Sequence, residues 1–149
     1  MKKVMMFLAL AIVPMFFASC TKSESDVIYS IGVEYTGGSF FGQKTGEAYN
    51  LYEEIVNELN ISKEEWKDRV TNGKYDATDS KAIAKYNTVE EQIKAKETTL
   101  RAKLDALQDK SFMFTINRKL YLRKIAPNGI DTYLKEYDLE FTNISSTQE

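Results

Sequence analysis

The sequence contains no histidine, and its single cysteine is Cys20. Without an imidazole, neither a Ser-His-Asp nor a Cys-His nucleophilic system can be assembled, and zinc hydrolase sites built on histidine are excluded as well. A lone cysteine excludes an intramolecular disulfide. The chemistry left to this chain is that of carboxylates, of lysine or tyrosine, and of cations bound by oxygen ligands.

The N-terminal apolar stretch is too short to cross a membrane as a helix. Residues 4–17 carry no charge, and fourteen residues at about 1.5 Å each span only about 21 Å of a roughly 30 Å hydrocarbon core. Pro14 further disfavours a continuous helix there. Because Lys2 and Lys3 precede the stretch and small residues follow it, residues 1–19 are predicted to be a cleavable signal peptide.

The end of that segment, Phe17-Ala18-Ser19-Cys20, resembles the lipobox of bacterial lipoproteins, in which a large apolar residue and two small ones precede a cysteine. Through these residues the chain resembles the small uncharacterised lipoproteins of Gram-negative bacteria. The resemblance implies cleavage between Ser19 and Cys20, a diacylglyceryl thioether on Cys20 and acylation of its amine. An ordinary secretory signal with a cysteine at the cleavage point is the alternative.

The residues after Cys20 indicate the membrane in which the lipoprotein is anchored. Thr21 is not aspartate, which in the sorting rule of that family points to the outer membrane. Lys22, Glu24 and Asp26 faintly resemble the charged stretch that directs some lipoproteins to the cell surface. We therefore expect a lipid anchor in the outer membrane, with the periplasmic or the cell-surface face left open.

Length and charge point to one small domain. Removing residues 1–19 leaves 130 residues, the size of an ordinary domain, with 18 basic and 22 acidic residues and a net charge of −4. An acidic surface gives no reason to expect nucleic acid as a partner, so membrane attachment has to come from the lipid. We expect a lipidated tether over residues 20–26, an α+β domain over 27–142 and a polar tail over 143–149.

Hydrophobic periodicity gives the expected elements. Residues 27–35 alternate as in a half-buried strand, the glycine-rich segment 36–46 is typical of a loop, and residues 48–59 show helical spacing. A capping box at Ser62 predicts a short helix that buries Trp66 and Val70. A long helix is expected over residues 80–109, with a possible break near Asn87, followed by strands 112–122 and 133–141 around a turn at residues 127–129.

The resulting order is β-α-α-(α)-β-β. It predicts an α+β domain with an antiparallel sheet of three or four strands, packed on one face by two or three helices.

The sequence motifs that could indicate a chemical function match their required patterns poorly. Residues 37–45 resemble a phosphate-binding loop, but Gln43 separates Gly42 from Lys44 and breaks the required spacing. The acidic pairs are typical of solvated helix faces, and Asp76-Ala77-Thr78-Asp79 lacks the glycine and the distal glutamate of a calcium loop. No catalytic residue, metal ligand or cofactor is expected.

Aromatic residues are the remaining candidates for ligand contact. Trp66 is expected to be a buried docking anchor and, if exposed, the leading contact. Tyr35, Tyr121, Tyr133 and Tyr137 lie at strand ends, where a ring can be exposed. The sequence thus predicts a non-catalytic binding or envelope-structural domain with an unidentified protein or glycan partner. Glycan binding through exposed aromatics is the alternative, followed by a carboxylate-dependent hydrolase.

Lipidation at Cys20 makes the first prediction. Substitution Cys20→Ser should leave the precursor uncleaved or release the protein into soluble fractions, because neither the thioether nor the acylated amine can form. Cell fractionation and mass spectrometry of the mature N-terminus measure this. A mature protein whose residue 20 carries no acyl group would refute it.

Overall fold

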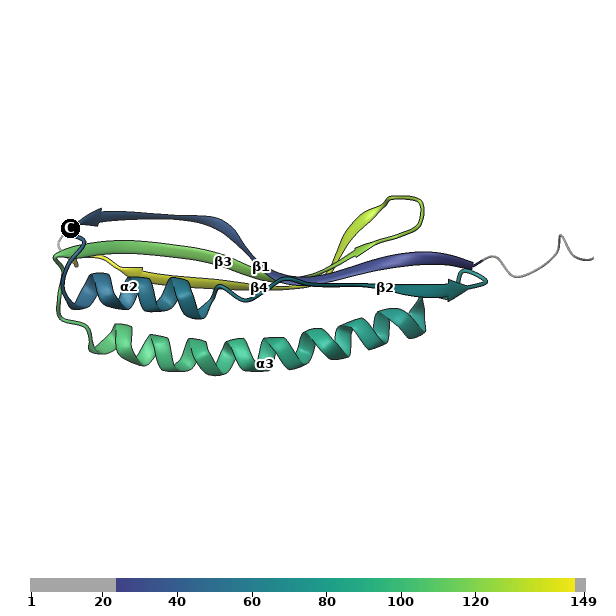
Figure 1. Cartoon of the computed structure of the whole chain (residues 1–149). Helices are drawn as coiled ribbons and strands as arrows, with labels where there is room; N and C mark the ends of the chain where they lie inside the picture. Colours follow the sequence, from purple (N-terminus) through teal and green to yellow (C-terminus); the bar gives the residue numbers. More distant parts are fainter. Residues whose placement is uncertain (1–23, 147–149) are drawn as a thin grey trace, which may run out of the picture.

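A computed structural model describes residues 24–146 of the chain. The expected signal peptide, its cleavage point at Ser19 and Cys20, and the first residues of the tether lie outside the described residues. The described part contains four strands and two helices (Figure 1). In chain order these are β1 (Glu24–Gly42), α2 (Glu47–Glu58), β2 (Glu64–Thr71), α3 (Asp76–Ala106), β3 (Phe112–Ile125) and β4 (Asp131–Asn143).

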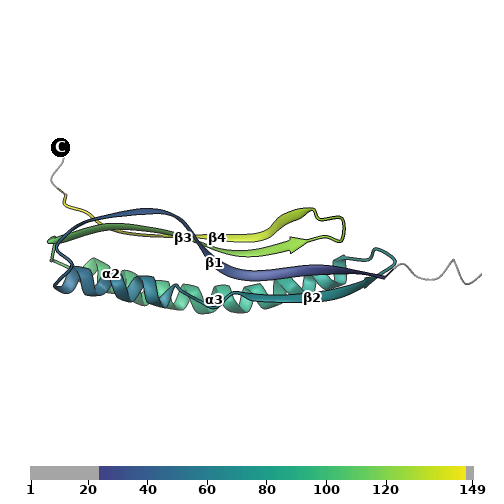
Figure 2. The same cartoon turned by 45° about the horizontal axis from the view of Figure 1, so that its top comes forward.

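The strands form one antiparallel sheet in the order β2-β1-β3-β4. Both helices run along the same side of this long, twisted sheet (Figures 1 and 2). We call the side facing the helices the covered face and the other side the open face. The expected α+β class and antiparallel sheet are confirmed, and the element order is β-α-β-α-β-β.

The core lies between the covered face and the helices. Alternate residues of the strands meet one stripe of each helix, as two-layer packing requires. The largest fully buried side chains are Tyr29, Ile31, Ile55, Leu59, Tyr86, Ile93, Phe112, Phe114, Leu120, Leu122, Leu139 and Phe141.

β1 is much longer than expected. The alternation of residues 27–35 is confirmed as strand. The loop predicted over residues 36–46 is wrong for residues 36–42, because pairing with β3 resumes after a bulge at Tyr35/Gly37 and continues to Gly42. The glycines make this possible by removing side chains from a close backbone approach. At Gly38 (φ 144°), an added Cβ would lie 2.4 Å from the carbonyl oxygen of Thr115.

The short helix predicted from the Ser62 capping box is also wrong, because residues 64–71 form strand β2. A spacing of four between Trp66 and Val70 fits one face of a helix and one face of a strand equally well. Pairing decides the outcome, since Trp66 lies directly opposite Tyr29 of β1 and the two rings stack with centroids 5.6 Å apart.

The long helix is a single element. α3 runs from Asp76 to Ala106 without the break considered near Asn87. Thr88 caps no helix there, because its hydroxyl donates to the carbonyl oxygen of Ala84, one turn earlier, at 3.3 Å.

The helix predicted over residues 48–59 and the turn at residues 127–129 are confirmed. At the turn, the Gly129 amide donates to the Ala126 carbonyl at 2.8 Å, and Gly129 has a φ of 81°. β4 continues through Asn143, whose side-chain amide donates to the carbonyl oxygen of Phe112 at 2.8 Å.

Candidate functional site

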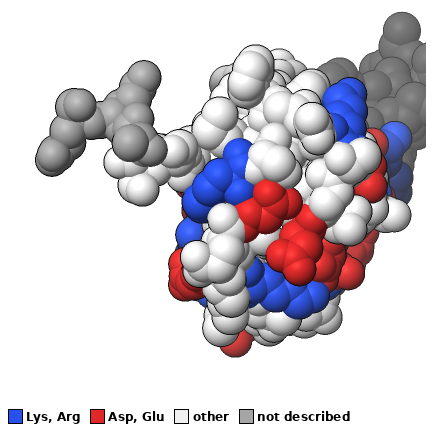
Figure 3. Space-filling view, turned by 90° about the vertical axis from the view of Figure 1, so that its left-hand side faces the viewer, with Lys and Arg blue, Asp and Glu red and all other residues white. Residues whose placement is uncertain are grey.

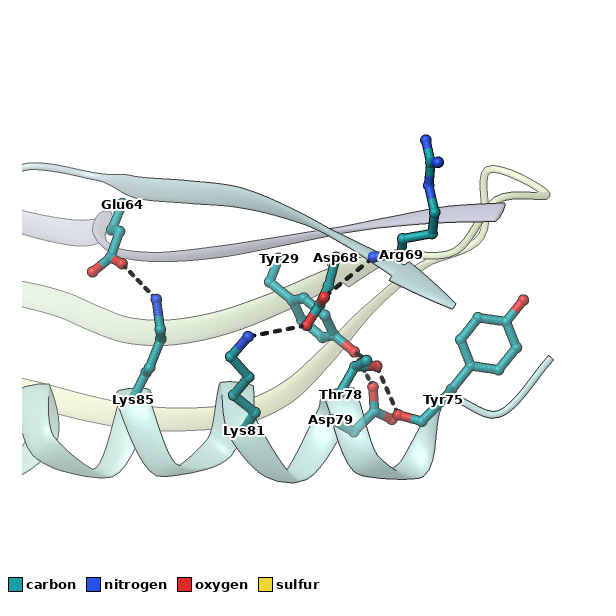
Figure 4. A network of polar contacts seen from close by, with 9 residues as sticks. All are labelled: Tyr29, Glu64, Asp68, Arg69, Tyr75, Thr78, Asp79, Lys81 and Lys85. Atoms are coloured by element: carbon teal, nitrogen blue, oxygen red, sulfur yellow. Dashed lines mark hydrogen bonds and ion pairs between the residues drawn. The ribbon is translucent and has the colours of Figure 1, made fainter. Parts of the chain in front are cut away.

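A polar network joins the sheet to the first turn of α3 (Figure 4). The hydroxyl of Tyr29 contacts the Thr78 hydroxyl at 2.8 Å and donates to the carboxylate of Asp79. The ammonium of Lys124 donates to the same carboxylate at 2.9 Å. Burial and the bond to Asp79 raise the pKa of Tyr29 above its ordinary value, so this phenol keeps its proton and is no base near neutral pH.

This network holds α3 against the sheet. Tyr29 is fully buried, and both oxygens of Asp79 are occupied, one by Tyr29 and one by Lys124. Two exposed ion pairs beside it, Lys85 with Glu64 and Lys81 with Asp68, join α3 to β2 (Figure 4). The arrangement is a structural tie between helix and strands and not a reactive centre.

Trp66 belongs to the same region. Tyr29 stacks on its ring, and the ammonium of Lys85 lies 4.3 Å from the ring centroid. The side chain is half-buried, and its indole nitrogen is buried without a hydrogen-bond partner in the structure. With these neighbours on the ring, Trp66 serves as the packing anchor of β2 and offers little surface to a ligand.

Tyr137 is held by a buried carboxylate. Its hydroxyl donates to Glu97 at 2.5 Å, and the ammonium of Lys94 lies 4.9 Å from its ring centroid. Arg101 donates twice to the other oxygen of Glu97, at 2.7 and 2.8 Å. The bond to Glu97 and burial raise the pKa of Tyr137 to about 12. Tyr137 therefore fixes α3 to β4, and we do not keep it as a candidate for ligand contact.

Tyr121 and Tyr133 lie together on the open face. Tyr121 is only 9% exposed and covers Gly32, where an added Cβ would lie 2.7 Å from the Tyr121 hydroxyl oxygen. Tyr133 meets it edge to face, with centroids 5.8 Å apart, and is 46% exposed. Of this pair, Tyr133 alone therefore presents an accessible ring to a ligand.

Tyr35 is the one sequence candidate that stands largely free. It is 66% exposed, and the guanidinium of Arg118, its cross-strand neighbour, lies 4.8 Å from the ring centroid. It lies on the part of β1 that has β3 on one side and no strand on the other, since β2 pairs with β1 only over residues 24–31.

Two phenylalanines on the same segment were missed by sequence reasoning. Phe40 and Phe41, which lie in the segment predicted to be a loop, are 55% and 75% exposed. Phe40 contacts the rings of Tyr52 and Phe112, each with centroids 6.0 Å apart. Their adjacency was the available signal, because neighbouring residues of a strand point to opposite faces and cannot both be buried by one helical layer.

These residues define what we call the aromatic edge: Tyr35, Phe40 and Phe41 of β1. A groove of about 290 Å³ runs beside it, lined among others by Tyr35, Gly38, Phe40, Tyr52, Ile116 and Arg118. Figure 3 views this end of the molecule. Charged side chains gather in its lower part, over the ends of the helices, whereas its uppermost part, where Figure 1 places the end of β1, is uncharged.

No protein-family model, curated protein or solved structure gives a significant match to this chain. Among residues 24–146, no helix combines the length and the apolar character needed to cross a membrane. The same residues contain no group of three or more acidic side chains arranged to hold a metal ion. The aromatic edge is therefore the candidate site, on the geometry of the chain itself.

The Tyr137 bond to Glu97 gives a prediction for alkaline pH. The folded-state pKa of about 12 lies above the ordinary value of 10.0, so the unfolded chain loses this proton first and the free energy of unfolding falls between pH 10 and pH 12. Tyr137→Phe should make that fall shallower, while lowering stability at neutral pH by about 1–2 kcal/mol through the lost bond. Urea unfolding across this pH range measures both effects. An unchanged slope would contradict the assignment.

Proposed function

We propose that this protein is a lipid-anchored outer-membrane protein whose domain binds a protein partner through the aromatic edge and catalyses no reaction. The observation that carries the proposal is the exposure of Tyr35, Phe40 and Phe41 on one short segment of β1. Clusters of exposed large apolar side chains on a small soluble domain are a mark of interaction surfaces. Burying one such ring contributes about 1.5–3 kcal/mol, so three rings suffice for a specific contact.

The shape of the domain supports this role. β1 begins at Glu24, four residues after the expected lipid attachment point, and the aromatic edge lies at the far end of the same strand (Figure 1). From Glu24 to Phe40, a strand rising about 3.3 Å per residue covers roughly 50 Å. The arrangement would thus present the aromatic edge well away from the anchored end.

Two carboxylates, Glu97 and Asp109, have structural roles, which argues against the hydrolase alternative. Glu97 forms an ion pair with Arg101 and accepts a hydrogen bond from Tyr137. Hydrogen bonds from Ser111 and from the amide of Ala48 lower the pKa of Asp109, which suits an anion that caps α2 and not a proton donor. A lowered pKa at Asp109 is the opposite of the raised pKa that a general acid needs.

Glycan binding is the second candidate, because sugars stack on exposed aromatic rings. Tyr133, braced by Tyr121 on the open face, is the observation that favours it. A single accessible ring offers less surface than the three residues of the aromatic edge, so we rank it second.

A photo-cross-linking experiment in cells tests the proposal. A photoreactive phenylalanine analogue in place of Phe41 should give a discrete protein adduct of the lipidated protein, because that ring would lie within the interface. The control places the same analogue at Ile130, which is 58% exposed at the opposite end, in the loop between β3 and β4. Adducts that are absent at Phe41, or identical at both positions, would refute the proposal. Binding to a glycan array that is lost in Tyr133→Ala would support the second candidate instead.

A further inference from the structure

The main chain of β1 has an unpaired side along the aromatic edge. β2 pairs with residues 24–31 of β1, whereas β3 pairs with β1 up to Gly42, so residues 33–42 have a strand on one side only. Every second residue of such a segment directs its N–H and C=O groups away from the neighbouring strand. A row of unpaired donors and acceptors of this kind is a template for another strand.

The orientation of these groups follows from three contacts. The Gln43 amide donates to the carbonyl oxygen of Ser111 on the β3 side at 3.1 Å, so by alternation Phe41 and Ser39 also point toward β3. Gly42, Phe40 and Gly38 then direct their main-chain groups outward. In agreement, the Phe112 carbonyl, opposite Gly42, points away from β1 to Asn143, and the Gly38 carbonyl accepts a long 3.4 Å hydrogen bond from the Tyr35 hydroxyl.

Charge distinguishes this edge from the other two free edges of the sheet. Five of the eight residues of β2 are charged, and so are five of the thirteen residues of β4. Charged side chains of this kind keep foreign strands from pairing with an edge. In residues 33–42 of β1 the only charged residue is Glu34. The aromatic edge thus lacks the protection that the other two edges have.

The groove beside this edge is positively charged. Arg118 donates one hydrogen bond, to the carbonyl of Asn117 at 3.1 Å, and has no carboxylate partner among the described residues. Lys44 lies 5.2 Å from the centroid of the Phe40 ring and also forms no ion pair within residues 24–146. A carboxylate of an incoming strand that reached Arg118 would therefore meet a cation that no described carboxylate neutralises.

We propose that residues 33–42 of β1 bind an extended peptide strand of a partner protein by adding it to the sheet, with an acidic side chain of that strand placed against Arg118. The inference rests on the proposed function in using the same aromatic edge, and it adds the chemistry of the partner. Outward main-chain groups supply the pairing, Tyr35 and Phe40 pack against apolar side chains, and Arg118 selects for acidic character. A second copy of this chain fits less well, because it would bring two sets of these cations together.

The test starts from a displayed library of random peptides of about twelve residues, selected on the full mature protein in detergent micelles. Enriched peptides should alternate apolar residues, carry at least one Asp or Glu, and lose binding to Phe40→Ser. Arg118→Gln should weaken a synthetic copy of the best peptide about tenfold. The matched control Lys135→Gln removes the same charge from an exposed side chain of β4 that forms no ion pair within residues 24–146, and it should leave the affinity unchanged.

N-methylation of the peptide backbone separates strand addition from other modes. Every second amide of an added strand points toward β1, and methyl groups on these amides should weaken binding at least about tenfold. Methyl groups on the remaining amides, which point away from β1, should have little effect. Equal effects of the two sets, or equal effects of Arg118→Gln and Lys135→Gln, would overturn the inference. So would a selection that yields no Phe40-dependent peptide, or a homodimer that Phe40→Ser dissociates. A protein adduct at Phe41 without such a peptide would leave the proposed function standing alone.

Discussion

The pairing of β1 with β3 is the interaction on which the rest of the structure depends. It extends from Ile28 to Gly42 of β1. Through it, the strand pair β2-β1 is joined to the strand pair β3-β4. A strand this long would curl away from its neighbour with the twist of the sheet, and the bulge at Tyr35/Gly37 takes up part of that twist. The glycines that follow then allow the close approach to Thr115 and Ser111. Because pairing continues where β2 has ended, one edge of β1 is left free.

Two buried polar clusters hold the single long helix against this sheet. Asp79 with Tyr29 and Lys124 fixes its first turn, and Glu97 with Tyr137 and Arg101 fixes its middle. A buried charge without partners would cost several kcal/mol, and here each carboxylate has both a cation and a phenol. Such clusters add specificity of alignment more than stability. They also engage the carboxylates of Asp79 and Glu97.

Hydrophobic periodicity located those elements whose local pattern fits only one kind of secondary structure. The alternation of β1 before the bulge, of β3 and of β4, and the helical stripe of α2 are of this kind. The β2 segment is not, since the spacing of Trp66 and Val70 satisfies both a helix and a strand, and only the neighbour Tyr29 decides between them. Glycines 37, 38 and 42 indicated a loop because their use in a close strand pairing depends on partners 70 to 80 residues later in the chain.

The same limit applies to the site. Tyr35 was found because alternation placed it at a strand end. Trp66, expected to be a buried anchor on a helix, is half-buried and stacks on Tyr29 from a strand. Phe40 and Phe41 were missed because exposure is a property of the assembled layers. Two adjacent aromatics between glycines become an exposed edge only when the chain is extended there and the only covering helices lie on one face.

Amide hydrogen exchange at Phe40 and Phe41, followed residue by residue by NMR, tests directly whether this part of β1 is paired with β3 on one side and free on the other. These neighbouring amides share one sequence context, but the account places the Phe41 amide in the ladder with β3 and the Phe40 amide at the free edge. It predicts that Phe41 exchanges at least about tenfold more slowly than Phe40, relative to their intrinsic rates. Equal protection of the two amides would contradict it, because the segment would then be either paired on both sides or not a strand at all.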